Sequence, residues 1–170
     1  LRLDAYFNEV ARVHPELNIK VKKIIRSYNK NSSTLVHGDF SPKNMLIFKK
    51  NIKYIDAETC NYGDPAFDVV FFTNHLLIKS IHIPLKQSEF IKCYKNFFNT
   101  YLKLINKNER QKFFKRCIEM IPIMLMARID GKSPVEYIKK KSIKNKIRLL
   151  AFKMINKPPV TLDNLIKYIK

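Results

Sequence analysis

Apolar residues recur at helical spacing over most of the chain, which predicts a mostly helical protein. The two helices nearest the N-terminus meet at His14-Pro15, where the first ends and the second begins. Residues 66–78 are apolar almost all round, as in a buried central helix. Further helices are expected over 87–105, 109–129, 139–157 and 161–169, and a capping-box pattern at 133–136 predicts another helix start there.

Three shorter stretches have the length and composition of strands. Residues 34–36 and 45–48 are apolar runs, and residues 52–55 alternate between apolar and polar side chains. The last two are close enough in the chain to form a small β hairpin. The overall pattern therefore predicts an α+β fold with few strands.

The loop between the first two expected strands carries an Asp and an Asn five positions apart, Asp39 and Asn44. Phosphoryl transfer needs a carboxylate that orients or deprotonates the acceptor hydroxyl, and oxygen ligands that hold magnesium near the phosphates. Asp39 suits the first role and Asn44 the second. Taken one by one, these residues are also ordinary turn formers.

Two acids, Asp56 and Glu58, follow the third expected strand and lie on the same side of an extended chain. If Asp56 lies beside Asn44, the two supply hard oxygen ligands for a magnesium ion that also binds phosphate and water. The motif Gly63-Asp64-Pro65-Ala66-Phe67-Asp68 comes next. This fixed order, with each residue at the end of an element, favours a functional site over a set of unrelated turns.

These motifs resemble the C-terminal lobe of the aminoglycoside phosphotransferase and choline kinase-like family, which is related to the protein kinases. The resemblance covers residues 37–44, 55–58 and 62–68. It implies that residues 1–170 form a single catalytic and substrate-binding lobe of protein kinase-like fold. In such a lobe a small β hairpin carries the catalytic and metal-binding loops.

The resemblance also implies roles for individual residues. Asp39 would be the catalytic base or the carboxylate that orients the acceptor, and Asn44 and Asp56 would bind Mg²⁺. Asp68 would brace the catalytic loop through hydrogen bonds, and His37 would hold the loop rather than transfer protons. Glu58 occupies a position where members of the family often have a second acid, so a supporting role is expected for it.

Several residues keep two interpretations each. Lys43 either contacts a phosphate of the nucleotide or is a solvated loop lysine. Arg128 and Asp130, in a stretch similar to the acceptor side of some family members, either contact the substrate or brace the catalytic loop, or else form an internal ion pair. Asn74 and His75 are polar exceptions in the central helix, and a hydrogen bond within the core is favoured over a substrate contact.

The expected activity is transfer of the γ-phosphate of ATP or GTP, with Mg²⁺, to a hydroxyl of an aminoglycoside, choline, sugar or related metabolite. The sequence has 3 glycines, all isolated, so it contains no Gly-rich phosphate loop. It also begins with Leu1. We therefore expect a catalytic lobe that lacks its N-terminal nucleotide lobe and binds ATP poorly alone.

The formal net charge of +19 would ordinarily indicate nucleic acid or an anionic membrane as partner. The lysines are spread through nearly every expected helix, so a dedicated nucleic-acid partner is not expected. No apolar run reaches membrane-spanning length and no secretion signal is present, which favours a cytoplasmic protein without membrane contact. Two alternatives stay open: a non-catalytic kinase-like binding module and a basic RNA-binding helical domain.

Overall fold

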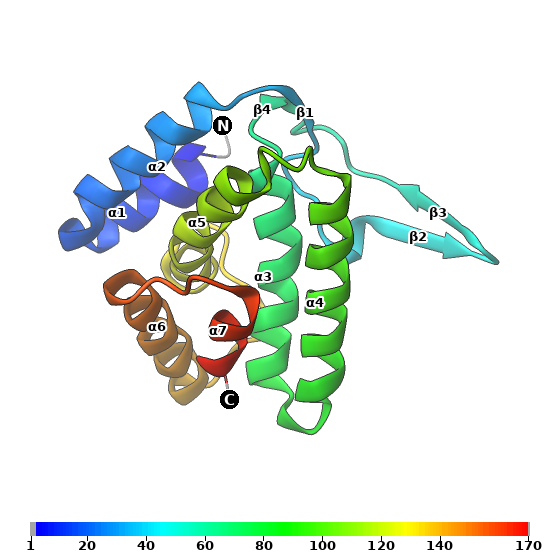
Figure 1. Cartoon of the computed structure of the whole chain (residues 1–170). Helices are drawn as coiled ribbons and strands as arrows, with labels where there is room; N and C mark the ends of the chain where they lie inside the picture. The colour runs from blue at the N-terminus through cyan, green and yellow to red at the C-terminus, as the bar shows by residue number, and fades with distance from the viewer. Residues whose placement is uncertain (1–2, 170) are drawn as a thin grey trace.

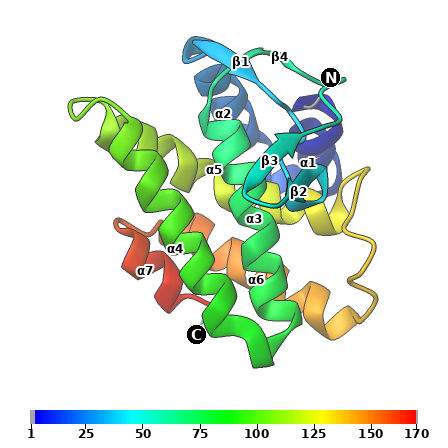
Figure 2. The same ribbon diagram turned by 90° about the vertical axis from the view of Figure 1, so that its right-hand side faces the viewer.

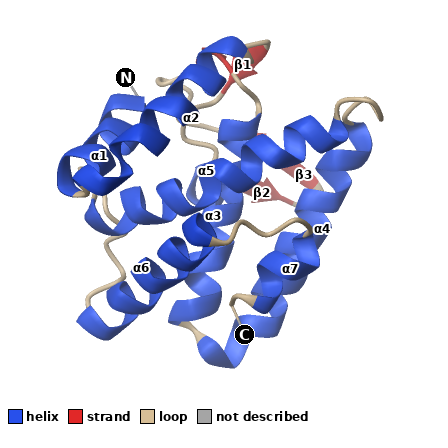
Figure 3. Ribbon diagram, turned by 60° about the vertical axis from the view of Figure 1, so that its left-hand side comes forward, coloured by secondary structure: helices blue, strands red, loops and turns tan. Residues whose placement is uncertain are grey.

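Helices form most of the protein, and its short strands lie toward one end (Figure 3). The structure is a computed structural model that describes residues 3–169. The N-terminal part consists of η1 (Asp4–Asn8), α1 (Glu9–Val13), η2 (Pro15–Leu17) and α2 (Asn18–Lys30). The helical break expected at His14-Pro15 is confirmed, because η2 begins at Pro15.

The strands pair as two separate antiparallel ribbons. β1 (Thr34–Val36) pairs with β4 (Asn61–Gly63), and β2 (Met45–Phe48) pairs with β3 (Asn51–Tyr54), which confirms the predicted hairpin. The short helix η3 (Pro42–Asn44) leads into β2. Figure 1 shows that the β2–β3 hairpin projects away from the helices. Its apolar residues are consequently exposed, for example Ile47 at 74% and Phe48 at 71%.

The helix α3 (Ala66–His82) lies at the centre of the protein, and its side chains are buried on nearly every face. It packs against α4 (Gln87–Leu104) and α5 (Arg110–Asp130), and the two views in Figures 1 and 2 show α3 and α4 side by side. η4 (Pro84–Lys86) forms the turn between α3 and α4. The prediction of a buried central helix from an all-round apolar pattern is therefore confirmed.

The second half of α5 is the other heavily buried segment, because residues 120–127 are all buried. The helices α1 and α2 pack against α5, as does α6 (Lys141–Asn156). The last helix is α7 (Leu162–Lys167). Among the helices of residues 3–169, none combines the length and hydropathy that a membrane span requires.

The helix start predicted at 133–136 is wrong. Residues 131–140 form an irregular loop, and α6 begins only at Lys141. The backbone carbonyl of Ser133 accepts a hydrogen bond from the Arg128 side chain, and the Val135 N–H donates to the Arg128 carbonyl. These bonds hold the segment against the end of α5, so the capping-box pattern does not lead to a helical turn.

Candidate functional site

A tight turn at Gly38 follows β1 and begins the loop that carries Asp39. Gly38 has a φ of +77°, and a Cβ at this position would lie 2.6 Å from the backbone oxygen of Thr59. Asp68, in the first turn of α3, accepts hydrogen bonds from the N–H groups of His37 at 2.6 Å and Gly38 at 3.0 Å. The central helix therefore holds the start of this loop directly.

Burial raises the pKa of Asp68, and the two backbone N–H donors act in the opposite direction by favouring the carboxylate. Both oxygens of the carboxyl group are used, one by each N–H. A side chain with this geometry connects α3 to the loop and has no direct access to a substrate.

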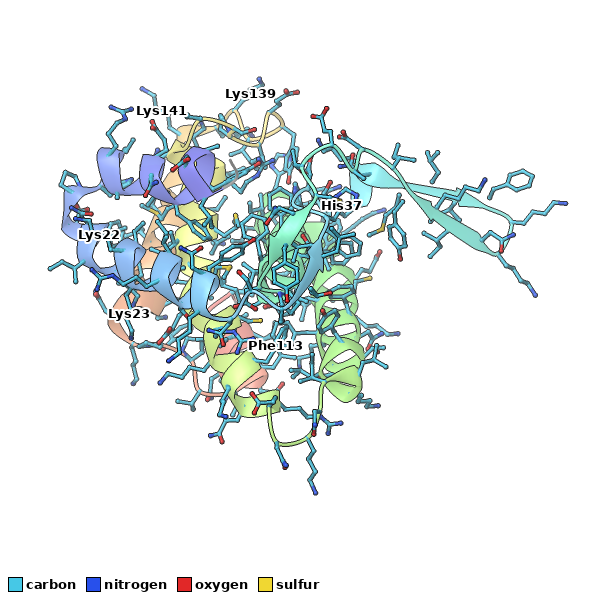
Figure 4. All side chains as sticks on the ribbon, turned by 90° about the horizontal axis from the view of Figure 1, so that it is seen from above. Lys22, Lys23, His37, Phe113, Lys139 and Lys141 are labelled. Atoms are coloured by element: carbon cyan, nitrogen blue, oxygen red, sulfur yellow. The ribbon has the colours of Figure 1, made fainter. Side chains whose placement is uncertain are left out.

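His37 connects the loop that leads into β2 with the loop that follows β3. Its Nδ1 accepts a hydrogen bond from the N–H of Asp39 at 3.3 Å, and its Nε2 lies 3.0 Å from the carbonyl oxygen of Ile55. Because Nδ1 acts as an acceptor, the ring hydrogen lies on Nε2, which donates to Ile55. Figure 4 shows His37 near the base of the hairpin. Both nitrogens are thus occupied by contacts that position the backbone.

Asp39 and Asn44 are buried at the two ends of the same loop. The Asn44 side-chain amide donates a hydrogen bond to the Asp39 carbonyl oxygen at 2.9 Å. This bond fixes the amide orientation and leaves Oδ1 of Asn44 available. The Nζ of Lys43 lies 3.1 Å from Oδ2 of Asp39, while the lysine side chain is 63% exposed. Lys43 is therefore exposed to solvent and pairs with the Asp39 carboxylate.

Asp56 and Glu58 lie in the loop after β3 and are both exposed. The N–H of Ile55 donates to the carbonyl oxygen of Asn44 at 3.0 Å, which brings the two loops together at the base of the hairpin. Asp56 has a φ of +66°, in the left-handed region that non-glycine residues rarely adopt. Asp adopts this region more readily than most residues, and the conformation occurs both in turns and at functional sites.

A cavity of about 540 Å³ lies between these loops and the end of α5. Asp39, Asp56 and Glu58 line it from the hairpin side. The other side is formed by residues from η1, α3, α5 and the loop after α5: Tyr6, His75, Lys79, Arg128, Ser133, Pro134, Val135, Glu136 and Tyr137. The tertiary structure therefore brings the acids at positions 39, 56 and 58 together with residues that are far away in the sequence.

Arg128 and Asp130 have different environments, although both lie in the last turn of α5. Arg128 lines the cavity. Asp130 is not among the residues that line it, and instead accepts hydrogen bonds from Nε and Nη2 of Arg148 at 2.9 and 2.6 Å and contacts Nε2 of His14 at 3.0 Å. Of the two interpretations of Asp130, the structure shows the internal ion pair.

Two residues, Asp64 and His75, have environments that sequence patterns did not reveal. Asp64, which is fully buried, accepts hydrogen bonds from the Ala66 N–H at the start of α3 and from Nε of Arg116 at 2.7 Å. The core hydrogen bond expected for His75 is absent at Nε2, which is buried and has no partner among residues 3–169. The polar position in an apolar helix was the only sequence signal for His75.

The donor set at the hairpin base fits a magnesium ion that takes most of its ligands from phosphate and water. Asn44 offers an amide oxygen and Asp56 a carboxylate, which are the hard ligands that Mg²⁺ prefers. Within residues 3–169, no group of three His, Cys, Asp or Glu side chains could hold a metal ion. Two protein ligands would be sufficient to hold Mg²⁺ only if the phosphates of a nucleotide supplied further ligands.

Comparison with known proteins supports a kinase-like assignment. The curated proteins include no significant match to this chain. The model of the ecdysteroid kinase-like family matches residues 2–107, a range that extends from η1 through α4 and includes the loops around Asp39 and Asp56. This family is kinase-like and related to the choline kinases and aminoglycoside phosphotransferases, to which the motifs bear a resemblance. Because the match covers more than half of the sequence, the chain belongs to the ecdysteroid kinase-like family.

Proposed function

We propose that this chain is the catalytic and acceptor-binding lobe of a phosphotransferase that moves the γ-phosphate of ATP or GTP to a hydroxyl of a small molecule. The observation that carries the proposal is that Asp39 and Asp56, from two separate loops, line one cavity of about 540 Å³. Membership of a kinase-like family supports the same reaction class.

In the proposed reaction, the acceptor hydroxyl binds next to Asp39. Its oxygen forms a bond to the γ-phosphorus while the bond from that phosphorus to the bridging oxygen of the nucleotide breaks. Asp39 orients the hydroxyl and accepts its proton, which later passes to solvent. The hydrogen bonds that the His37 and Gly38 N–H groups donate to Asp68 restrain this loop, so the Asp39 carboxylate is positioned before the acceptor binds.

Asn44 and Asp56 would hold Mg²⁺ together with phosphate oxygens and water. When bound, the ion neutralises negative charge on the phosphates. Lys43 would exchange its contact with Asp39 for a nucleotide phosphate, which its exposed side chain permits. Glu58, next to Asp56 in the cavity lining, would hold water in the outer coordination sphere. A nucleotide-binding lobe would supply the Gly-rich loop and the strand lysine.

The proposal is tested on the intact protein by measuring ADP or GDP release with Mg²⁺, the nucleotide and a panel of hydroxyl compounds. The panel should include an ecdysteroid, which the family's name suggests, together with choline, an aminoglycoside, sugars and hydroxy acids. Asp39→Asn and Asp56→Ala should each reduce transfer at least about 100-fold, because each removes a group that acts on the reacting atoms.

The matched control is Asp163→Asn, which alters an exposed acid that pairs with Lys95 far from the cavity. This variant should retain full transfer. Circular dichroism should show that all three variants stay folded. Full activity of Asp39→Asn would contradict the mechanism, and a wild-type protein that binds a compound without any transfer would favour the non-catalytic binding module.

A further inference from the structure

His75 has an unsatisfied polar atom in the wall of the cavity. Its side chain is 8% exposed and lines the cavity, and Nε2 is buried without a hydrogen-bond partner among residues 3–169. Burial, and next the charge of Arg128, lower the pKa of His75 to about 4, so the ring is neutral at pH 7. A buried ring nitrogen without a partner costs free energy unless something binds to it.

Arg128 has a second buried nitrogen without a hydrogen-bond partner among the described residues. Its Nη1 donates to the hydroxyl of Tyr6 at 3.3 Å and to the carbonyl oxygen of Ser133 at 2.5 Å, but Nε is buried without a partner. Both partners are neutral, and no carboxylate of residues 3–169 forms an ion pair with Arg128. By contrast, Arg116 pairs with Asp64 and Arg148 with Asp130.

Both side chains line the cavity, and both lie next to the Phe71 ring. The guanidinium carbon of Arg128 lies 5.6 Å from the centroid of the Phe71 ring, and the ring centroid of His75 lies 5.5 Å from the same point. The Arg128 guanidinium also lies 5.7 Å from the Tyr6 ring, so aromatic rings restrict where it can move. The Arg128 guanidinium, which has no carboxylate partner among residues 3–169, is thus held in the cavity wall that also contains the neutral His75 ring.

We propose that His75 and Arg128 form a subsite that binds an oxyanion, specifically a carboxylate carried by the hydroxyl-bearing acceptor. Arginine presents parallel N–H groups that match a carboxylate, and such charge-assisted bonds are stronger than those between neutral groups. The inference rests on the proposed function in one respect, namely that this cavity receives the acceptor. Lys79, which also lines the cavity, adds a second positive charge near the subsite.

A matched pair of probes tests the subsite: 4-(hydroxymethyl)benzoate and its neutral analogue 4-(hydroxymethyl)benzamide. Binding of each to the intact protein is measured by isothermal titration calorimetry, without nucleotide and at about 150 mM salt, which screens exposed charges. The acid should bind at least about tenfold more tightly than the amide. In Arg128→Gln this ratio should fall to nearly one, and in His75→Phe it should fall by a few fold.

Arg12→Gln is the matched control, because it removes the same charge from an arginine that pairs with Glu9 and is absent from the cavity lining. Its ratio should equal that of the wild type. The ratio compares two ligands on one variant, so partial unfolding lowers both affinities equally. If Arg128→Gln does not fold, Arg128→Lys keeps the charge without the planar fork and should reduce the ratio to about threefold or less.

Equal binding of acid and amide, or a preference that persists in the Arg128 variants, would overturn the subsite. Failure of the proposed function would give a different result from failure of the subsite. In that case no acceptor is phosphorylated, while the preference for the acid and its dependence on Arg128 remain. Asp39→Asn should likewise keep the preference for the acid, since the carboxylate subsite does not include Asp39.

Discussion

His75 illustrates how a single buried side chain affects both the site and the stability of the protein. The imidazole on α3 lies next to the ring of Phe71 and lines the cavity, and its burial disfavours a charged ring. Charges near it include those of Arg128, Lys79, Lys43 and Asp39, of which only Asp39 favours protonation. The pKa of about 4 therefore results from burial and from neighbouring cations together.

The low pKa of His75 predicts a loss of stability in mild acid. An unfolded chain binds a proton at His75 below about pH 6.5, whereas the folded protein does so only near pH 4. Between these values the unfolded state binds more protons, so the free energy of unfolding should fall by about 3 kcal/mol from pH 6.5 to pH 4 because of this group.

Urea unfolding at several pH values measures this effect as the difference between wild type and His75→Phe. Paired carboxylates also lose stabilising contacts in acid, but they contribute to both proteins and cancel in the difference. A His75→Phe protein that loses as much stability as the wild type between pH 6.5 and pH 4 would contradict the prediction.

At the scale of elements, one ion-pair network connects three segments that are distant in the sequence. Asp130 at the end of α5 binds Arg148 of α6 and His14, which lies between α1 and η2. Burial alone would raise the pKa of Asp130, but the hydrogen bonds from Arg148 and His14 together outweigh it and lower the pKa. Asp130 consequently acts as a structural residue.

This network predicts that Asp130→Ala destabilises the protein. The substitution leaves the partly buried guanidinium of Arg148 without its bidentate partner, and the expected loss is about 2–4 kcal/mol in the free energy of unfolding. Denaturant unfolding measures the loss. The control Asp163→Ala removes an exposed ion pair with Lys95 and should leave the stability almost unchanged. Similar losses in the two variants would argue against a structural role for Asp130.

The β2–β3 hairpin projects away from the helices (Figure 1). Exposed apolar residues on both strands, including Leu46, Phe48 and Ile52, are unusual for a free surface. Under the proposed function, the nucleotide-binding lobe would lie over this ribbon and cover part of its apolar surface.

At the scale of the whole molecule, positive charge is spread over separate surfaces. Figure 4 shows Lys22 and Lys23 on one side of the protein and Lys139 and Lys141 on another. Among the described residues, the acids of the cavity, which include Asp39, Asp56 and Glu58, lie together at a third place. A distribution of this kind attracts polyanions without providing one shaped binding surface.

The distribution predicts that any RNA binding is non-specific. The double variants Lys22→Ala/Lys23→Ala and Lys139→Ala/Lys141→Ala remove equal charge from different surfaces, so both should weaken binding of a labelled RNA by a similar factor. Fluorescence anisotropy over a salt series should show a steep loss of affinity with salt and a slope reduced by about 1–2 in each variant. A large effect of only one pair would instead indicate a dedicated RNA surface.

The sequence by itself determined most of the helical and strand elements, though not β4, and indicated a kinase-like protein. Periodicity located α3, α4, α5 and the β2–β3 hairpin, because each has a continuous pattern over its own length. The motif order from His37 to Asp68 indicated a kinase-like protein, and the match to the ecdysteroid kinase-like family supports that class. These properties depend on residues close together in the chain.

Only the tertiary structure decided which distant residues share an environment. The loop at 131–140 formed where a capping pattern predicted a helix, because bonds to Arg128 compete with the helical turn. Arg128 and Asp130 looked equivalent in the sequence, yet one lines the cavity and the other binds Arg148. The unpartnered nitrogen of His75 arises from packing between helices, which no local pattern records.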